Sequence, residues 1–161
     1  MTNAVQTSYS LYLTPGVEGQ LLNTSSLDLW NYAAETVVPY GRAVARGSSD
    51  NTCQLIGSGL SFLGVARNII SPENPLYQDK TQYEIGEVVS VVRKGYIFVY
   101  SEQAVNKGDP VYYRITANTA PNDVIGRFRK DSDSGKAVLL ASATFEKTIS
   151  AAGITIIRIP V

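Results

Sequence analysis

The sequence contains no histidine and a single cysteine, Cys53. Histidine is the commonest general base, the usual partner of a nucleophilic serine or cysteine, and the commonest metal ligand. Without it, one cysteine leaves too few ligands for a structural zinc site. A lone cysteine also cannot form a disulfide within the chain, so we expect a reducing compartment, with Cys53 as a small buried apolar residue.

Net charge is absent as well, because 14 Lys and Arg residues balance 14 Asp and Glu residues. A nucleic-acid binder requires a basic patch and a polybasic membrane anchor requires clustered cations, so neutrality predicts neither a nucleic-acid nor a membrane partner. The charged fraction of 17% is low, which is common on surfaces that contact other protein. A neutral chain does not repel its own copies, which favours a place in an assembly.

Long apolar runs and nucleotide-binding motifs are missing too. No run approaches the roughly 18 apolar residues of a membrane-spanning helix, and MTNAVQTSYSLYL lacks the basic and apolar regions of a signal peptide. There is no GxxxxGK[ST] phosphate loop, and Gly57-Ser58-Gly59 lacks the third glycine of a dinucleotide-binding loop.

Two acidic segments are the remaining candidates for chemistry. Asp131-Ser132-Asp133-Ser134-Gly135 resembles the first half of a calcium loop, but its glycine comes one position early and Ser142 stands where a glutamate is required. Asp109, between Gly108 and Pro110, has the neighbours of a turn that leads into a strand. We therefore predict no catalytic, cofactor-binding or metal-binding residues, no cofactor and no enzymatic activity.

The beginning of the chain differs from the rest. Residues 1–41 contain three acids and no basic residue. Apolar side chains recur there without clean periodicity, and residues 26–32 favour one short helical turn. A mobile tail is one interpretation, but it has little use for a tryptophan and several leucines. We therefore expect residues 1–36 to form an extended N-terminal arm that lies on a neighbouring surface.

Residues 37–161 are expected to form one β-rich domain. β-Branched and aromatic runs predict strands near 40–46, 61–68, 88–92, 96–100, 111–116, 124–129, 137–143 and 154–159. Arg93-Lys94-Gly95 is expected to join two of them as a hairpin. No helical pattern of about ten residues is present. The fold class is therefore all-β, a small antiparallel β-barrel or sandwich with an extended N-terminal arm.

Several predicted strands lack a polar face. Both alternating faces of Tyr96–Tyr100 are apolar or aromatic, whereas a strand of a small antiparallel sheet normally has one polar face. Such strands are enclosed in a barrel corner or covered by another subunit. We predict a protein interface that uses these apolar residues and those of the arm, namely Leu11, Leu13, Leu29, Trp30, Tyr32, Tyr96, Phe98 and Tyr100.

Residues 40–160 resemble the structural cement, or head-decoration, proteins of tailed bacteriophages. The similar segments are YEIGEVVSVVRKGYIFVYSEQAVNKGDPVYYR and GRFRKDSDSGKAVLLASATFEKTISAAGITIIRI. The motifs that carry the resemblance, by their order and spacing, are Gly86-Glu87-Val88, Arg93-Lys94-Gly95, Ala104-Val105, Gly108-Asp109, Val111, Gly126-Arg127-Phe128 and Ile154–Ile159.

The resemblance implies a non-enzymatic protein that binds the outer capsid surface of a virion and contacts the major capsid protein as a homotrimer at three-fold positions. It also implies synthesis in the cytoplasm of a bacterial host. Two alternatives stay open. One is another virion structural protein, such as a head fibre base or a tail component. The other is a small β-barrel carbohydrate-binding module that stacks Trp30, Tyr77 and Tyr83 on sugars.

Overall fold

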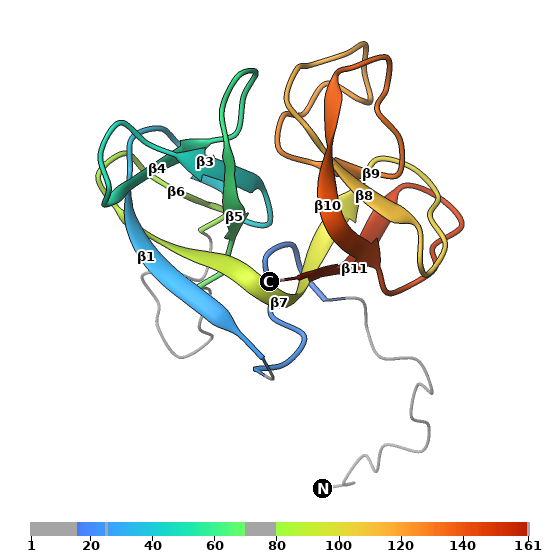
Figure 1. The fold of residues 1–161 in the computed structure, drawn as a ribbon, viewed down its shortest axis with the longest axis horizontal. Coiled ribbons are helices and arrows are strands. Elements are labelled where there is room, and N and C mark those ends of the chain that lie inside the picture. Colours follow the sequence, from blue (N-terminus) through green and yellow to red (C-terminus); the bar gives the residue numbers. More distant parts are fainter. Residues whose placement is uncertain (1–15, 25, 70–79, 161) are drawn as a thin grey trace, which may run out of the picture.

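The computed structural model describes residues 16–24, 26–69 and 80–160, and in these ranges the chain has strands and no helix (Figure 1). The predicted all-β class is confirmed, and no helix there is long and apolar enough to cross a membrane. The strands are β1 (Asp28–Ala34), β2 (Val38–Pro39), β3 (Ala43–Arg46), β4 (Thr52–Leu55), β5 (Phe62–Ala66), β6 (Gln82–Tyr83), β7 (Val88–Ser101), β8 (Pro110–Arg114), β9 (Phe128–Arg129), β10 (Ala137–Phe145) and β11 (Gly153–Ile159).

The long strand β7 belongs to two closed barrels. The first has the order β1-β4-β3-β5-β7 and closes where β7 pairs with β1. The second has the order β7-β11-β10-β8-β9 and closes where β9 pairs with β7. Figure 1 shows the two barrels as lobes that diverge from β7. The predicted barrel is therefore confirmed, but the chain builds two of them around one shared strand.

The number of strands explains why the sheet is mixed rather than fully antiparallel. Each ring contains five strands, and strand directions cannot alternate all the way around an odd-numbered ring. At least one neighbouring pair in each barrel must therefore be parallel. These pairs are β1–β4, with Ala33 opposite Thr52, and β7–β9, with Ser101 opposite Phe128.

The predicted hairpin at Arg93-Lys94-Gly95 is wrong. Strand β7 runs without interruption from Val88 to Ser101. Its first half pairs with β1 and β5, and its second half pairs with β11. Gly95 has a φ of 129°, a conformation that side chains disfavour. The glycine therefore lets β7 change course between the barrels instead of reversing it.

The predicted arm boundary after residue 36 is also wrong. Residues 28–34 form strand β1 rather than a helical turn, and this strand pairs with both β7 and β4. Further upstream, the Gly19 N–H donates to the Phe98 carbonyl at 2.8 Å and the Leu22 N–H donates to the Tyr96 carbonyl at 3.1 Å. Residues 16–24 and 26–34 therefore belong to the barrel unit, and residues 1–15 lie outside the described ranges.

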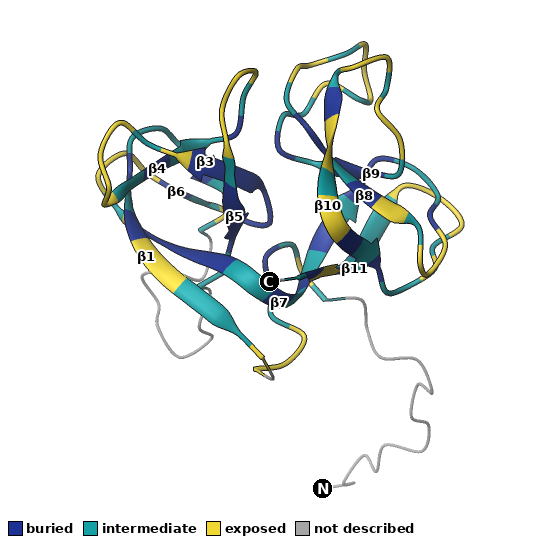
Figure 2. Cartoon of the chain, in the orientation of Figure 1, coloured by how far each residue is buried: buried dark blue, intermediate teal, exposed yellow. Residues whose placement is uncertain are grey.

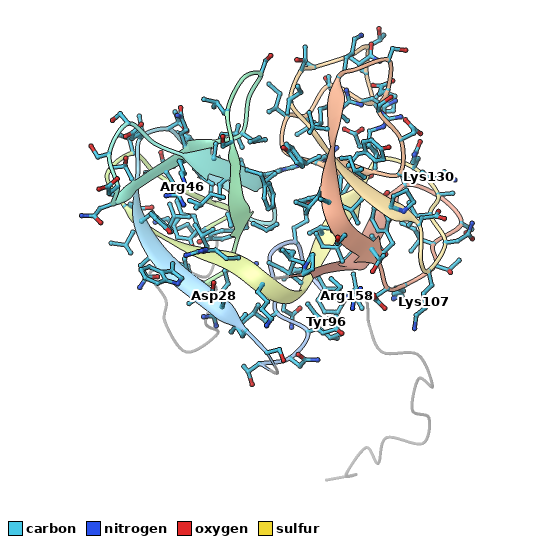
Figure 3. All side chains as sticks on the ribbon, viewed as in Figure 1. Asp28, Arg46, Tyr96, Lys107, Lys130 and Arg158 are labelled. Carbon is cyan, nitrogen blue, oxygen red and sulfur yellow. The ribbon has the colours of Figure 1, made fainter. Side chains whose placement is uncertain are left out.

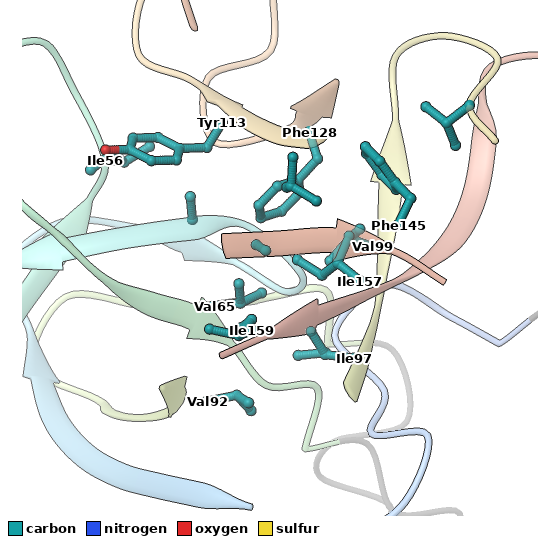
Figure 4. Close-up of a cluster of buried hydrophobic side chains, with 14 of the residues drawn as sticks. Ile56, Val65, Val92, Ile97, Val99, Tyr113, Phe128, Phe145, Ile157 and Ile159 are labelled. Atoms are coloured by element: carbon teal, nitrogen blue, oxygen red, sulfur yellow. The ribbon is translucent and has the colours of Figure 1, made fainter. Parts of the chain in front are cut away.

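Two apolar cores stabilise the molecule. One is confined to the first barrel and its β2–β6 ribbon, and contains the buried Cys53. The other crosses between the barrels and joins Val65 and Val92 to Phe128 and Ile157 (Figure 4). Because this second core contains side chains from both lobes, the two barrels form one packed unit.

The second face of the apolar half of β7 is partly covered within the chain. Ile97 and Val99 are fully buried in the core that the barrels share. The opposite face of this part of β7 is half-buried, and a Cβ atom on Gly16 would lie only 2.7 Å from the Phe98 ring. In this part of β7, the lack of a polar face therefore reflects packing within the chain on one face and partial cover on the other.

Candidate interaction surface

The structure places the predicted interface residues in different environments. Leu11 and Leu13 lie outside the described residues. Tyr32 is 7% exposed and belongs to the core of the first barrel, so its assignment to an interface is wrong. Leu29 is half-buried against the shared core. Tyr32 therefore does not share a surface with the exposed aromatic residues.

The aromatic residues of β7 also differ from one another. Phe98 packs beneath Gly16, and the Arg127 guanidinium lies 4.1 Å from the centre of the Tyr100 ring. Both rings therefore contact their own chain. Tyr96 is half-buried and lies on the side of the molecule shown at the bottom of Figure 3. Of the predicted set, Tyr96 and Trp30 are the described residues best placed to contact a partner.

Trp30 is exposed but held in position. It is 54% exposed, and Figure 2 shows the exposed stretch of β1 around it. Its indole Nε1–H donates to Asp28 Oδ1 at 2.8 Å. The Arg93 guanidinium lies 5.4 Å from the centre of the indole ring, and its Nε lies 3.6 Å from Asp28 Oδ2. The three side chains fix one another, so the ring is oriented before any partner binds.

Two hollows continue from this cluster along β7. The first is lined by Asp28, Arg93 and Lys94 together with apolar side chains of β5, β10 and β11. The second is lined by Lys94, Tyr96 and Arg158, and Pro160 lines both hollows. This side of the molecule therefore combines an exposed aromatic ring, shallow apolar floors and several cations.

Exposed apolar residues elsewhere were missed in the sequence. Ile85 and Val88 are 69% and 64% exposed, and Leu139 on β10 is 49% exposed. Strand β10 pairs irregularly with β8 between Leu139 and Thr144, which turns part of an apolar run toward solvent (Figure 2). In the sequence, only the lack of apolar and polar alternation in the run AVLLASATF indicates this exposed apolar surface.

The acidic loop at residues 131–135 binds arginines of its own chain. Arg114 is fully buried, and its Nε and one terminal nitrogen each lie 2.7 Å from a Glu102 oxygen. Arg114 also donates to Asp133 at 2.6 Å, and Arg129 donates to Asp131 at 2.7 Å. The Arg114 hydrogen bond holds the pKa of Asp133 below its ordinary value. Among the described residues, no group of three or more Cys, Asp or Glu side chains is arranged to hold a metal ion.

Asp109 is a turn residue, as predicted. Its Oδ2 accepts the Asn106 N–H at 2.8 Å, and Gly108 has a φ of 93°. The Gly108 N–H donates to the Phe145 carbonyl at 2.7 Å, and the Phe145 N–H donates to the Asp109 carbonyl at 3.0 Å. Backbone hydrogen bonds therefore hold the turn against the end of β10, and the Asp109 carboxylate stabilises the turn itself.

The geometry gives little support to a sugar-stacking surface. Tyr83 is 1% exposed, and its hydroxyl donates to the Arg67 carbonyl at 2.7 Å. Tyr77 lies outside the described residues, and Arg93 lies over the Trp30 ring. The described aromatic residues of that hypothesis therefore do not form a flat, open platform.

A solved structure from a phage capsid is similar to this fold. No curated protein is significantly similar in sequence. A chain from the capsid of Myoviridae phage XM1 is similar with a TM-score of 0.73 and 17% identity, over 98% of each chain; at this identity the similarity establishes the fold. The head fiber gp8.5 N base of bacteriophage phi29 has a TM-score of 0.43 and 14% identity, over 83% of this chain and 93% of that one, which is too low to support an inference.

A family comparison covers nearly the whole sequence. The family described as structural cement protein (E217 gp24/Pam3 gp6) matches residues 5–160. The match includes both barrels, the shared strand β7 and the Gly108-Asp109 turn. With a match of this extent, the chain belongs to the structural cement protein family.

Proposed function

We propose that this protein binds the outer surface of a phage head and stabilises contacts between major capsid subunits. The family match over residues 5–160 carries the proposal. The two closed barrels are consistent with this role. Within the described ranges, each ring pairs its strands with one another and leaves no free strand edge, so side chains make the contacts with the capsid. The proposed role is structural and needs neither catalysis nor a cofactor.

The stabilisation would arise from linked equilibria. A ligand that binds the assembled lattice but not separated subunits stabilises the lattice, by about 2.7 kcal/mol per site when its free concentration is 100-fold above Kd. The sites repeat over the head, so small contributions accumulate. Tight binding at each site is therefore not required for a large effect on the whole particle.

We further infer that the major capsid protein is the partner, that the bound form is a homotrimer at three-fold positions, and that residues 1–15 reach a neighbouring surface. The resemblance to head-decoration proteins supports the trimer, and a net charge of zero allows copies to associate. In a trimer, contacts made after the first become intramolecular, which raises the overall affinity. Synthesis in the host cytoplasm precedes assembly on the head.

An add-back assay tests the proposal. Purified protein is mixed with expanded heads of its own phage that lack it, and bound protein is measured after sedimentation. We expect saturable binding and a higher temperature for head disruption. Protein that stays in the supernatant, or that binds tails instead of heads, would contradict the cement function. Light scattering of the free protein then reports its oligomeric state separately.

A further inference from the structure

We infer that the protein docks on the head through one basic stripe and that the capsid surface beneath the stripe is acidic. The stripe consists of Arg93, Lys94, Arg158 and Lys107, with the rings of Trp30 and Tyr96 beside these cations. This inference rests on the proposed cement function and identifies the face of the molecule that performs it.

The stripe is continuous through contacts along one side of the molecule. Arg93 lies over Trp30 at 5.4 Å, and its neighbour Lys94 shares a hollow with Tyr96 and Arg158. Tyr96 and Arg158 are directly opposite each other in the β7–β11 pairing. Figure 3 shows Asp28, Tyr96, Arg158 and Lys107 in succession along this side.

Glu146 joins the last two cations of the stripe. Its two oxygens lie 3.7 Å from the Arg158 Nε and 3.9 Å from the Lys107 Nζ. Both cations still reach solvent, since their side chains are 46% and 71% exposed. One half-buried carboxylate therefore positions two exposed positive charges without neutralising both of them.

The stripe has more positive than negative charge. Three of its four cations form salt bridges with two acids, Asp28 and Glu146, and the fourth, Lys94, has no salt bridge to a described residue. The chain as a whole has no net charge, so this surplus is local. A local surplus of positive charge steers the protein toward an acidic surface and fixes its orientation there.

The aromatic residues beside the stripe give it the character of an interface centre. Tryptophan, tyrosine and arginine are the residues most enriched among those that dominate binding energy. The Trp30 ring is already held by Asp28 and Arg93, so little side-chain freedom remains to be lost on binding. The expected partner site is thus a shallow pocket for an indole ring with carboxylates around it.

Nucleic acid is the other macromolecule that a basic surface can attract. Binding to a phosphate backbone depends on many cations without acidic residues among them. This stripe has only four cations, and two acids form salt bridges with them. The oriented indole and the apolar hollows also fit a folded protein surface better than a phosphate backbone. We therefore assign the stripe to the capsid subunit, and DNA competition enters the test.

Two matched double variants test the inference in the full-length protein. Lys94→Gln with Arg158→Gln removes two charges from the stripe. Arg46→Gln with Lys130→Gln removes two charges from elsewhere on the molecule, as Figure 3 shows. We expect the stripe variant to bind depleted heads with an affinity lower by about tenfold or more, which is the loss expected for one strong contact. Its binding should also depend less on salt. The control should bind like the original protein, and both variants should keep the thermal midpoint.

The outcomes separate the inference from the proposed function. If the original protein binds heads and the stripe variant binds equally well, the docking face is wrong while the cement function stands. Equal losses in the two variants would show a general charge effect and would also overturn the stripe. Duplex DNA that displaces the original protein from heads would assign the stripe to nucleic acid instead. If the original protein binds no heads, the proposed function itself fails.

Discussion

Gly108 and Asp109 allow a direct test of a turn residue against a functional carboxylate. Asp109→Asn keeps an oxygen that accepts the Asn106 N–H, so we expect stability and head binding to change little. Gly108→Val forces a β-branched residue to a φ of 93° and should cost about 1–3 kcal/mol. Urea unfolding measures the stability of the two variants, and sedimentation with depleted heads measures their binding.

The space around Gly108 makes this comparison clean. A Cβ atom there would meet no atom within 4 Å outside the neighbouring residues, so we expect a loss of stability in Gly108→Val to come mainly from backbone strain. A folded Asp109→Asn protein that no longer binds heads would refute the purely structural role of the carboxylate.

Asp133 is the residue for which we expect a pH effect. Arg114 holds its pKa below the ordinary value, so the folded state favours the carboxylate. This stabilisation is present above about pH 3.9, the ordinary pKa of aspartate, and it is lost as the pH falls through the lower folded value. We expect Asp133→Asn to lower stability at pH 7 by about 1.5–3 kcal/mol, the range for hydrogen bonds to charged groups.

Urea unfolding at pH 7 and at pH 3 measures the Asp133 effect. The difference between Asp133→Asn and the original protein should shrink toward the acid side, because below about pH 3.9 the unfolded chain takes up a proton at Asp133 that the folded state disfavours. Asparagine tolerates the positive φ of 46° at this position, so strain does not complicate the comparison. A difference that stays constant down to pH 2 would show that the ion pair does not account for it.

Some residue roles were predictable from the sequence because they depend on immediate neighbours. The turn at Asp109 is one, since glycine before it and proline after it specify the local chain path. Tyr32 and Tyr83 were not, because their burial depends on the closure of the first barrel and on the β2–β6 ribbon. An aromatic residue has the same local pattern whether its ring packs inward or faces solvent.

Among the elements, strand β7 shows why local patterns mislead. The sequence predicts two apolar strands separated by Arg93-Lys94-Gly95, which also describes one strand that passes from one barrel to the next. Only pairing partners distant in sequence distinguish these cases, and they are β1 and β5 for the first half and β11 for the second. Most other predicted strands are present, although β9 is limited to Phe128–Arg129.

Strand β1 leads to a prediction about truncation. A chain that begins at Val37 loses the strand that closes the first barrel, and with it the pairing to both β4 and β7. Several buried side chains would become exposed, each contributing about 1.5–3 kcal/mol, against a typical total stability of only 5–15 kcal/mol. We expect this chain to show no cooperative thermal unfolding.

A chain that begins at Gly16 is the matched comparison. It keeps residues 16–24, which donate and accept backbone hydrogen bonds with β7, so we expect its thermal midpoint to stay close to that of the full chain. Its occupancy on depleted heads should fall if residues 1–15 contact a neighbouring surface. Cooperative unfolding of the Val37 chain near the original midpoint would show that β1 is dispensable.

At the scale of the whole molecule, the two barrels behave as one body because they share both a strand and a core. Phe62 on β5 stacks against Tyr113 on β8 with ring centroids 5.0 Å apart, so side chains of the two lobes are in direct contact. In a rigid unit of this kind, a force applied to one lobe by a bound partner is carried to the other lobe. This rigidity suits a protein proposed to connect neighbouring capsid subunits.

The sequence predicts only part of the candidate surface, because its residues are distant in sequence and meet only in the folded chain. Trp30 was identified from its type, but Arg158 and Lys107 are far from it in sequence and join it only through the β7–β11 pairing and through Glu146. A neutral total charge concealed the local surplus, because composition averages over all faces. The fold class needs only local patterns, whereas a surface needs the topology.

The most direct test of the cement function is a difference density map between heads that carry the protein and heads that lack it. We expect density on the outer surface that bridges adjacent capsid subunits and fits the two-barrel unit, with three copies around each occupied position and the side of Trp30 and Arg158 toward the shell. Density confined to the tail, density inside the shell, or no difference between the particles would contradict the proposed function.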